Sequence, residues 1–284
     1  GLTGRRIAVE LNEEIVKLGQ AFARNTRDDV REILLDSPVE LDGLPGDWKA
    51  KHVPGDDGKI HVTTQYPDYY PIMTYARAPD VRERLYREFK NRGYPQNIAV
   101  LSDLIAKRYE LARLLGYPNW AAYATEDKMI GSAVNAASFI DRISQVSRQA
   151  AERDYAVLLD RKRDDFPVAN TVEDWEKGYY ENRIKTERYA FDPQSVRPYF
   201  NFRAVQRGLF DLTGRLFGVT YRQVHGLKLW HKDVTAWDVY EGERQLGRFY
   251  LDLHPRPDKY GHAAQFDYRT GIAGRRLPHA VLVC

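Results

Sequence analysis

The segment Gln245–Cys284 restricts the fold most strongly, because proline and glycine divide it into short apolar runs. Runs of this length between turn-forming residues are typical of β-strands. The predicted strands are Thr235–Tyr240, Leu246–Leu253, His262–Asp267 and Ala280–Cys284. Since each strand follows the previous one after a short connection, they predict a small, mainly antiparallel sheet.

The second of these strands has two chemically different faces. Successive side chains of a strand point to opposite sides of the sheet. One side is apolar and is expected to be buried, and it consists of Phe249, Leu251 and Leu253. The other consists of Tyr250, Asp252 and His254. That second face either carries chemistry or is simply the solvated side of a half-buried sheet, and the pattern leaves both interpretations open.

Helical spacing dominates the chain before this sheet. A helix from Glu10 to about Leu35 is predicted by apolar residues at helical intervals, namely Leu11, Ile15, Leu18 and Phe22. Ser132 can cap a longer helix that runs to about Asp164, before Pro167. The predicted fold class is therefore mainly α with a small antiparallel β-sheet, an α+β fold.

A domain boundary is expected near residue 131, where the first group of helices ends. Residues 1–131 would form a helical segment with a short β excursion between Pro38 and Thr64. Residues 132–284 would form long helices followed by the small sheet.

Charge and composition exclude several classes of protein. The 43 basic and 40 acidic residues are interleaved and leave a net charge of +3, so no basic surface for nucleic acid is expected. No apolar run is long enough to cross a membrane. Cys284 is the single cysteine and cannot form an internal disulfide, which favours a reducing, cytoplasmic location.

One long motif and several shorter ones resemble a known family. Residues Gly247–Ala264 read GRFYLDLHPRPDKYGHAA, and other matching runs follow the family's order: Glu14–Gly19, Tyr66–Met73, Arg197–Phe200 and Trp230–Val234. Together they resemble the thimet oligopeptidase, neurolysin and oligopeptidase A family of zinc metallopeptidases. His254 departs from the pattern, because the family has an aromatic Tyr or Phe there.

The resemblance implies a two-lobed helical fold with a deep channel, in which zinc serves the hydrolysis of short peptides. The zinc would be held by a helix with the motif H-E-x-x-H and by a further Glu. None of the seven histidines of this sequence is spaced in that way. We therefore expect part of a zinc oligopeptidase: this chain supplies scaffold and a wall of the substrate cleft, binds no zinc itself and is inactive alone. The alternative is a non-enzymatic peptide-binding or structural module related to these enzymes.

The segment between the second and third predicted strands is the candidate substrate-binding site. An extended peptide can add to the edge of a sheet through main-chain hydrogen bonds, and small side chains leave that approach open. The candidates are Gly261, His262, Ala263, Ala264 and Gln265. Alternatively, the two alanines allow a helix to pack closely.

Two further expectations concern the neighbouring residues. Asp252, Arg256 and Lys259 are candidates for orienting the metal-binding helix through hydrogen bonds, with ordinary loop salt bridges as the alternative. Val281–Cys284 would form an exposed apolar strand, through which the chain could associate with itself.

Overall fold

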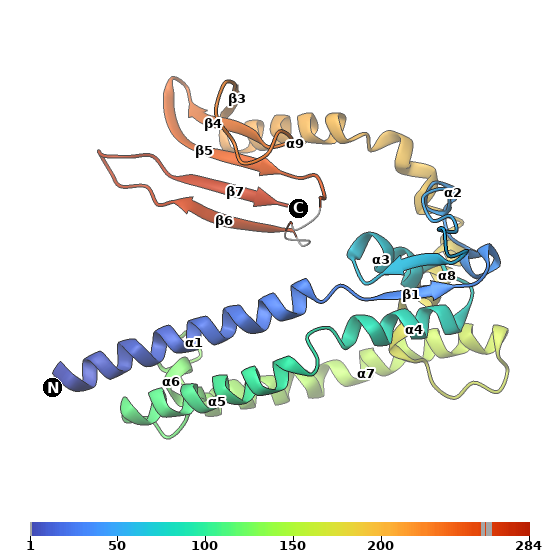
Figure 1. The fold of residues 1–284 in the computed structure, drawn as a ribbon, viewed down its shortest axis with the longest axis horizontal. Coiled ribbons are helices and arrows are strands. Elements are labelled where there is room, and N and C mark those ends of the chain that lie inside the picture. The colour runs from blue at the N-terminus through green and yellow to red at the C-terminus, as the bar shows by residue number, and fades with distance from the viewer. Residues whose placement is uncertain (1, 257–258, 260–262) are drawn as a thin grey trace. The chain divides into compact units, whose positions relative to one another are not determined.

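The computed structural model describes residues 2–256, 259 and 263–284 and divides the chain into two compact units, Gly1–Ala190 and Phe191–Cys284 (Figure 1). The boundary expected near residue 131 falls within the first unit, between the helices α6 (Trp120–Glu126) and α7 (Ala133–Asp165). It stays a prediction.

The first unit is largely helical and has three apolar cores among its described residues, the smallest of them around Val172, Tyr179 and Tyr180. One lies between α1 (Leu2–Asp28) and α5 (Gln96–Leu114), where Leu11 and Ile15 pack against Leu104 and Leu111. Another is built around a two-stranded sheet. The remaining elements of this unit are β1 (Glu32–Leu35), a 3-10 helix (Pro38–Leu41), α2 (Gly46–Lys49), β2 (Ile60–Thr63), α3 (Tyr66–Tyr75), α4 (Pro79–Lys90) and α8 (Asp174–Tyr189).

The prediction of one helix through Leu35 is wrong at its end. The helix α1 stops at Asp28, and Glu32–Leu35 pairs antiparallel with Ile60–Thr63. Ile33 and Leu35 are buried while the residues before each of them are exposed, which is the period of a strand. The short β excursion expected in this region is therefore present.

The helix α7 begins and ends close to its predicted limits. The Ser132 side chain accepts a hydrogen bond from the amide of Asn135 at 3.1 Å, which satisfies a donor at the helix N-terminus. Near its C-terminus, Lys162 forms an ion pair with the buried Glu176 of α8. This pair helps to hold α7 against α8.

The second unit is a five-stranded sheet with one long helix. Its elements are a 3-10 helix (Pro193–Tyr199), α9 (Phe202–Phe217), β3 (Thr220–Val224), β4 (Thr235–Glu241), β5 (Arg244–Asp252), β6 (Ala264–Arg269) and β7 (His279–Val283). The strand order is β3-β4-β5-β7-β6. Only the β5–β7 pairing of this sheet is parallel, among the described residues. The predicted class, mainly helical with a small sheet, is confirmed, although the sheet is mixed.

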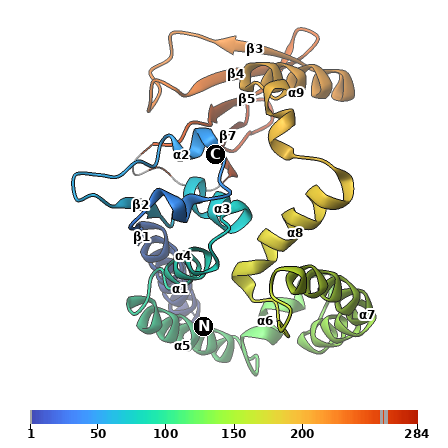
Figure 2. The ribbon, with the colours of Figure 1, turned by 90° about the vertical axis from the view of Figure 1, so that its right-hand side faces the viewer.

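Both faces of β5 are covered near its end. On one face α9 runs along the sheet (Figure 2), and the ring of Phe210 lies 4.7 Å from that of Trp237 and 6.0 Å from that of Phe249. On the other face Tyr250 packs with Val234 and Ala236. Tyr250 and Asp252 are only 7% and 3% exposed. The interpretation of this face as a solvated one is therefore wrong for Tyr250 and Asp252, whereas His254, which follows the strand, is exposed.

The C-terminal strand lies inside the sheet. β7 pairs with β5 on one side and with β6 on the other. Gly247 permits the close approach of the chain that leads into β7, since a Cβ there would lie 3.0 Å from the carbonyl oxygen of Pro278. The main chain of this strand is therefore not open to another chain, because it has a partner strand on each side and the edges of the sheet are β3 and β6. The Leu282 side chain is still 37% exposed, and self-association through this strand stays a prediction.

Candidate functional site

The carboxylate of Asp252, at the end of β5, collects several donors. Arg256 binds it with both terminal nitrogens, at 2.6 and 2.9 Å, and the indole of Trp230 donates to Oδ2 at 2.9 Å. The ammonium of Lys259 lies 3.3 Å from Oδ1. The three residues singled out from the sequence, Asp252, Arg256 and Lys259, are thus brought together. Trp230 was missed as their partner, although it belongs to one of the family-like motifs.

These contacts determine the charge of Asp252. The Arg256 guanidinium is the main cause that holds the pKa of this carboxyl far below its ordinary value, with Trp230 and Lys259 contributing, although burial alone would raise it. Asp252 is therefore a permanent anion at neutral pH. It cannot act as a general acid or base there.

Lys259 ties the β5–β6 connection to the end of β7. Its ammonium donates to three main-chain carbonyls: those of Asp252 and His254, each at 2.8 Å, and that of Cys284 at 2.6 Å. The amide of Cys284 also donates to the carbonyl of Asp252 at 2.9 Å. The network thus joins β5, the loop that follows it and the end of β7.

An aromatic cluster lies on the same side of the sheet as this network. The rings of Trp230 and Tyr268 flank Tyr250, at 5.5 and 5.6 Å between centroids. The hydroxyl of Tyr250 is 3.1 Å from Nδ1 of His279, whose Nε2 faces Arg269. Burial, with the charges of Arg269 and Arg248, lowers the pKa of His279. His279 is therefore held neutral.

The candidate peptide-binding residues lie at the edge of the sheet. Ala264 and Gln265 begin β6, which pairs only with β7 among the described strands, and Ala263 directly precedes it. The strand is exposed beyond Ala264. Gly261 and His262 lie outside the described residues.

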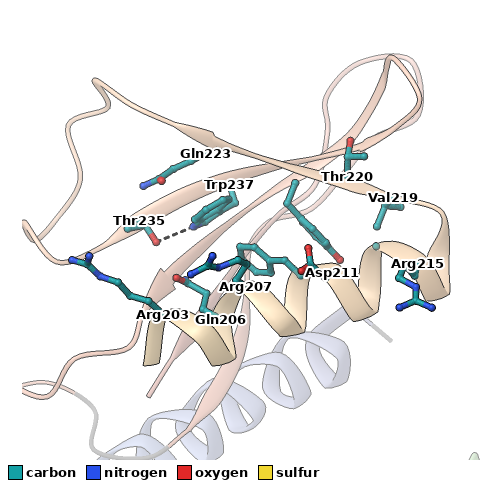
Figure 3. Close-up of a pocket in the computed structure, with 13 residues that line it drawn as sticks. Arg203, Gln206, Arg207, Asp211, Arg215, Val219, Thr220, Gln223, Thr235 and Trp237 are labelled. Atoms are coloured by element: carbon teal, nitrogen blue, oxygen red, sulfur yellow. Dashed lines mark hydrogen bonds between the residues drawn. The ribbon is translucent and has the colours of Figure 1, made fainter. Parts of the chain in front are cut away.

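A groove of considerable size lies elsewhere in this unit, between α9 and the strands β3 and β4 (Figure 3). It has a volume of about 710 Å³. Figure 3 shows Arg203, Gln206 and Arg207 along α9 across from Thr235 and Trp237. With Arg215 and one carboxylate, Asp211, the lining is positively charged. None of the site residues predicted from the sequence lines this groove. The sequence feature that could have indicated it is the spacing of Arg203 and Arg207, which places both side chains on one face of α9.

The described residues do not fit a zinc site. No group of three or more His, Cys, Asp or Glu side chains that could hold a metal ion occurs within the described ranges. Structural and catalytic zinc sites need three or four such ligands at one point. Within the same ranges, no helix is both long and apolar enough to span a membrane.

Comparison with known proteins supplies an independent test of the motifs. Residues 72–284 match the model of Peptidase family M3. Oligopeptidase A of Escherichia coli is 28% identical, and the alignment covers 97% of this chain and 43% of that protein. Saccharolysin of Saccharomyces cerevisiae is 27% identical and the thimet-like oligopeptidase of Dictyostelium discoideum 26%, each over 99% of this chain and 43% of the relative. The resemblance noted in the sequence is confirmed, and the chain spans less than half the length of these relatives.

Proposed function

This chain belongs to peptidase family M3, and on that basis we propose that it forms part of an oligopeptidase that hydrolyses short peptides. The family match over residues 72–284 is the observation that carries this proposal. The relatives named oligopeptidase support short peptides as the substrate class. Within such an enzyme the chain provides scaffold and one wall of the substrate cleft.

The cleft wall in this proposal is the edge strand β6 with the residues that precede it. Ala263, Ala264 and Gln265, together with Gly261 and His262, would receive an extended peptide by adding it as a further strand. The position of β6 at the end of the strand order supports this role. The small side chains of the two alanines keep the approach open.

The network around Asp252 would hold this wall in place. Arg256 and Lys259 fix the connection that leads from β5 toward β6, and they neutralise the buried carboxylate of Asp252. In the whole enzyme we assign them the further role of orienting the helix that binds the metal. Replacing Asp252 by Ala in the whole enzyme should then weaken zinc binding and turnover together.

Zinc would be a cofactor of the whole enzyme. When bound, it would polarise the carbonyl group of the scissile peptide bond. Because the described residues offer no ligand set, we assign no step of the reaction to this chain. Its own contribution is to bind and align the peptide.

The second candidate function is a peptide-binding module without catalysis. The lack of a metal-ligand cluster in the described part of the chain favours it. We place either protein in a reducing compartment such as the cytoplasm, because Cys284 is exposed and is the single cysteine.

The decisive experiment combines metal analysis with a peptide-cleavage assay. The 284-residue chain is incubated with zinc and a set of short peptides, and cleavage is followed by mass spectrometry with and without a chelator. We expect peptide binding without chelator-sensitive cleavage, and cleavage by the whole enzyme that carries these residues. If this chain alone binds stoichiometric zinc and cleaves peptides, the proposal that the zinc ligands lie outside this chain is contradicted. If the whole protein binds peptides but does not cleave them, the second candidate function, a peptide-binding module without catalysis, is supported instead.

A further inference from the structure

A second site lies in the first unit, in a cavity between the start of α4 and the helices α7 and α8. Its volume is about 350 Å³, within the lower range of small-molecule sites. Arg82 and Tyr180, which are 1% and 0% exposed, form its interior. The other lining residues are Arg77, Asp165, Phe166, Tyr179 and Arg183. Arg77 and Phe166 are exposed enough to mark its opening.

Three residues that line this cavity each have a buried donor without an acceptor. Nε of Arg82, Nε of Arg183 and the hydroxyl of Tyr180 lack a hydrogen-bond partner among the described residues. Buried polar groups in proteins are nearly always paired, so each unpaired one requires an explanation. Here all three belong to residues that line one cavity. An acceptor inside the cavity would satisfy them together.

The charges favour an anion as that acceptor. Within the described ranges, no acidic side chain forms an ion pair with Arg82. Its Nη1 donates only to the carbonyls of Ala76 and Arg77, while its guanidinium lies 4.2 Å from the centre of the Tyr179 ring. A buried guanidinium without a counter-charge is unfavourable. Arg183 is paired with Glu187 at 2.9 Å, so the uncompensated positive charge of the cavity is that of Arg82 at its interior end.

The one acidic residue of the lining is already neutralised. The carboxylate of Asp165 lies 3.0 Å from Nη1 of Arg161. Burial is the main cause that raises the pKa of Tyr180 to about 12, with Asp165 and Glu176 contributing. The Tyr180 hydroxyl is thus protonated at neutral pH and able to donate.

We propose that this cavity binds a phosphate group, held by Arg82, Arg183 and Tyr180. A phosphate can offer a separate oxygen to each of the three donors. A carboxylate has only two oxygens, so two of the donors would have to share one. The volume leaves room for a small organic phosphate as well as for the free ion. This binding is independent of the peptide-binding edge of the sheet.

The test measures binding of inorganic phosphate to the full 284-residue chain by calorimetry, at an ionic strength held constant with sodium chloride. Phosphate should bind and raise the melting temperature. Tyr180→Phe should weaken binding about tenfold, the usual effect of one lost hydrogen bond to a charged group. The same variant should be no less stable than the parent chain without phosphate, because it removes an unpaired hydroxyl.

Tyr189→Phe is the matched control, since Tyr189 lies on the same helix and is 73% exposed. Tyr189→Phe should bind phosphate as tightly as the parent chain does. Arg183→Gln is a second cavity variant, which should weaken phosphate binding and which tests the site even if Tyr180→Phe does not fold. Acetate in place of phosphate should bind more weakly. No binding beyond the effect of chloride, equal binding by the parent and both cavity variants, or tighter binding of acetate would each overturn the proposal.

Discussion

Asp252 connects several residues at the end of the sheet. Its buried carboxylate is the counter-charge shared by Arg256 and Lys259, whose side chains are 23% and 5% exposed. Removing one partner of a buried ion pair leaves the other charge uncompensated. Asp252→Ala should therefore lower the free energy of unfolding by about 3 kcal/mol. Urea unfolding measures the change.

The matched control for that substitution is Glu243→Ala. The Glu243 side chain is 91% exposed and reaches Arg222 only at 3.5 Å, so the loss should stay below about 0.5 kcal/mol. Equal losses in the two variants would show that the Asp252 network does not stabilise the sheet.

His279 makes stability depend on pH. Its pKa is lowered in the folded chain, so the folded state binds a proton less readily than the unfolded state. Its contribution is complete above the ordinary histidine pKa of about 6.5 and is lost as the pH falls below that value. Comparison of urea midpoints at about pH 7.5 and 5.5 should show a smaller decrease in His279→Gln than in the parent chain. An equal decrease would contradict this assignment.

At the scale of elements, periodicity predicted the helices α1 and α7 but could not show that β1 replaces the last part of the first predicted helix. Ile33 and Leu35 fit a helical pattern and a strand pattern equally well over so few residues, and their partner β2 is distant in sequence. The strand β3 was missed for a similar reason. The parallel pairing of β5 with β7 depends on contacts across the whole unit, which local pattern does not encode.

The helix α9 is attached to the sheet mainly through Phe210. Its ring contacts Tyr221, Trp237 and Phe249, with centroids 4.7 to 6.0 Å away. Because Phe210 is only partly buried, Phe210→Ala should cost about 2 kcal/mol and increase hydrogen exchange along α9. Phe217→Ala, at the exposed end of the same helix, should change little. Unchanged exchange in Phe210→Ala would contradict this attachment.

At the scale of the whole chain, the sequence motifs identified the family and brought Asp252, Arg256 and Lys259 into one hypothesis. They could not reveal the cavity at Arg82, because it forms where helices distant in sequence meet. The groove along α9 depends on how that helix packs on the strands β3 and β4, which the motifs do not describe. The motif residues Gly261 and His262 lie outside the described residues. Their role remains a prediction.

Self-association is also expected through a second surface, besides the one predicted at the C-terminal strand. One face of α9 is apolar and 46% to 69% exposed, and it consists of Val205, Leu209, Leu212 and Leu216. Exposed apolar patches of this kind favour association. Light scattering should show concentration-dependent association that Leu212→Glu reduces and Val39→Glu, at an exposed site in the other unit, does not. A monodisperse monomer would contradict this prediction.

The peptide-binding edge is tested most directly by residue-resolved hydrogen exchange of the chain with and without a short peptide. Main-chain pairing with an added strand protects amides on the outward side of β6. We predict slower exchange at alternate residues within Ala264–Arg269, and no change in β3 at the opposite edge of the sheet. Unchanged exchange in β6 at saturating peptide, or protection of β3 instead, would contradict the account.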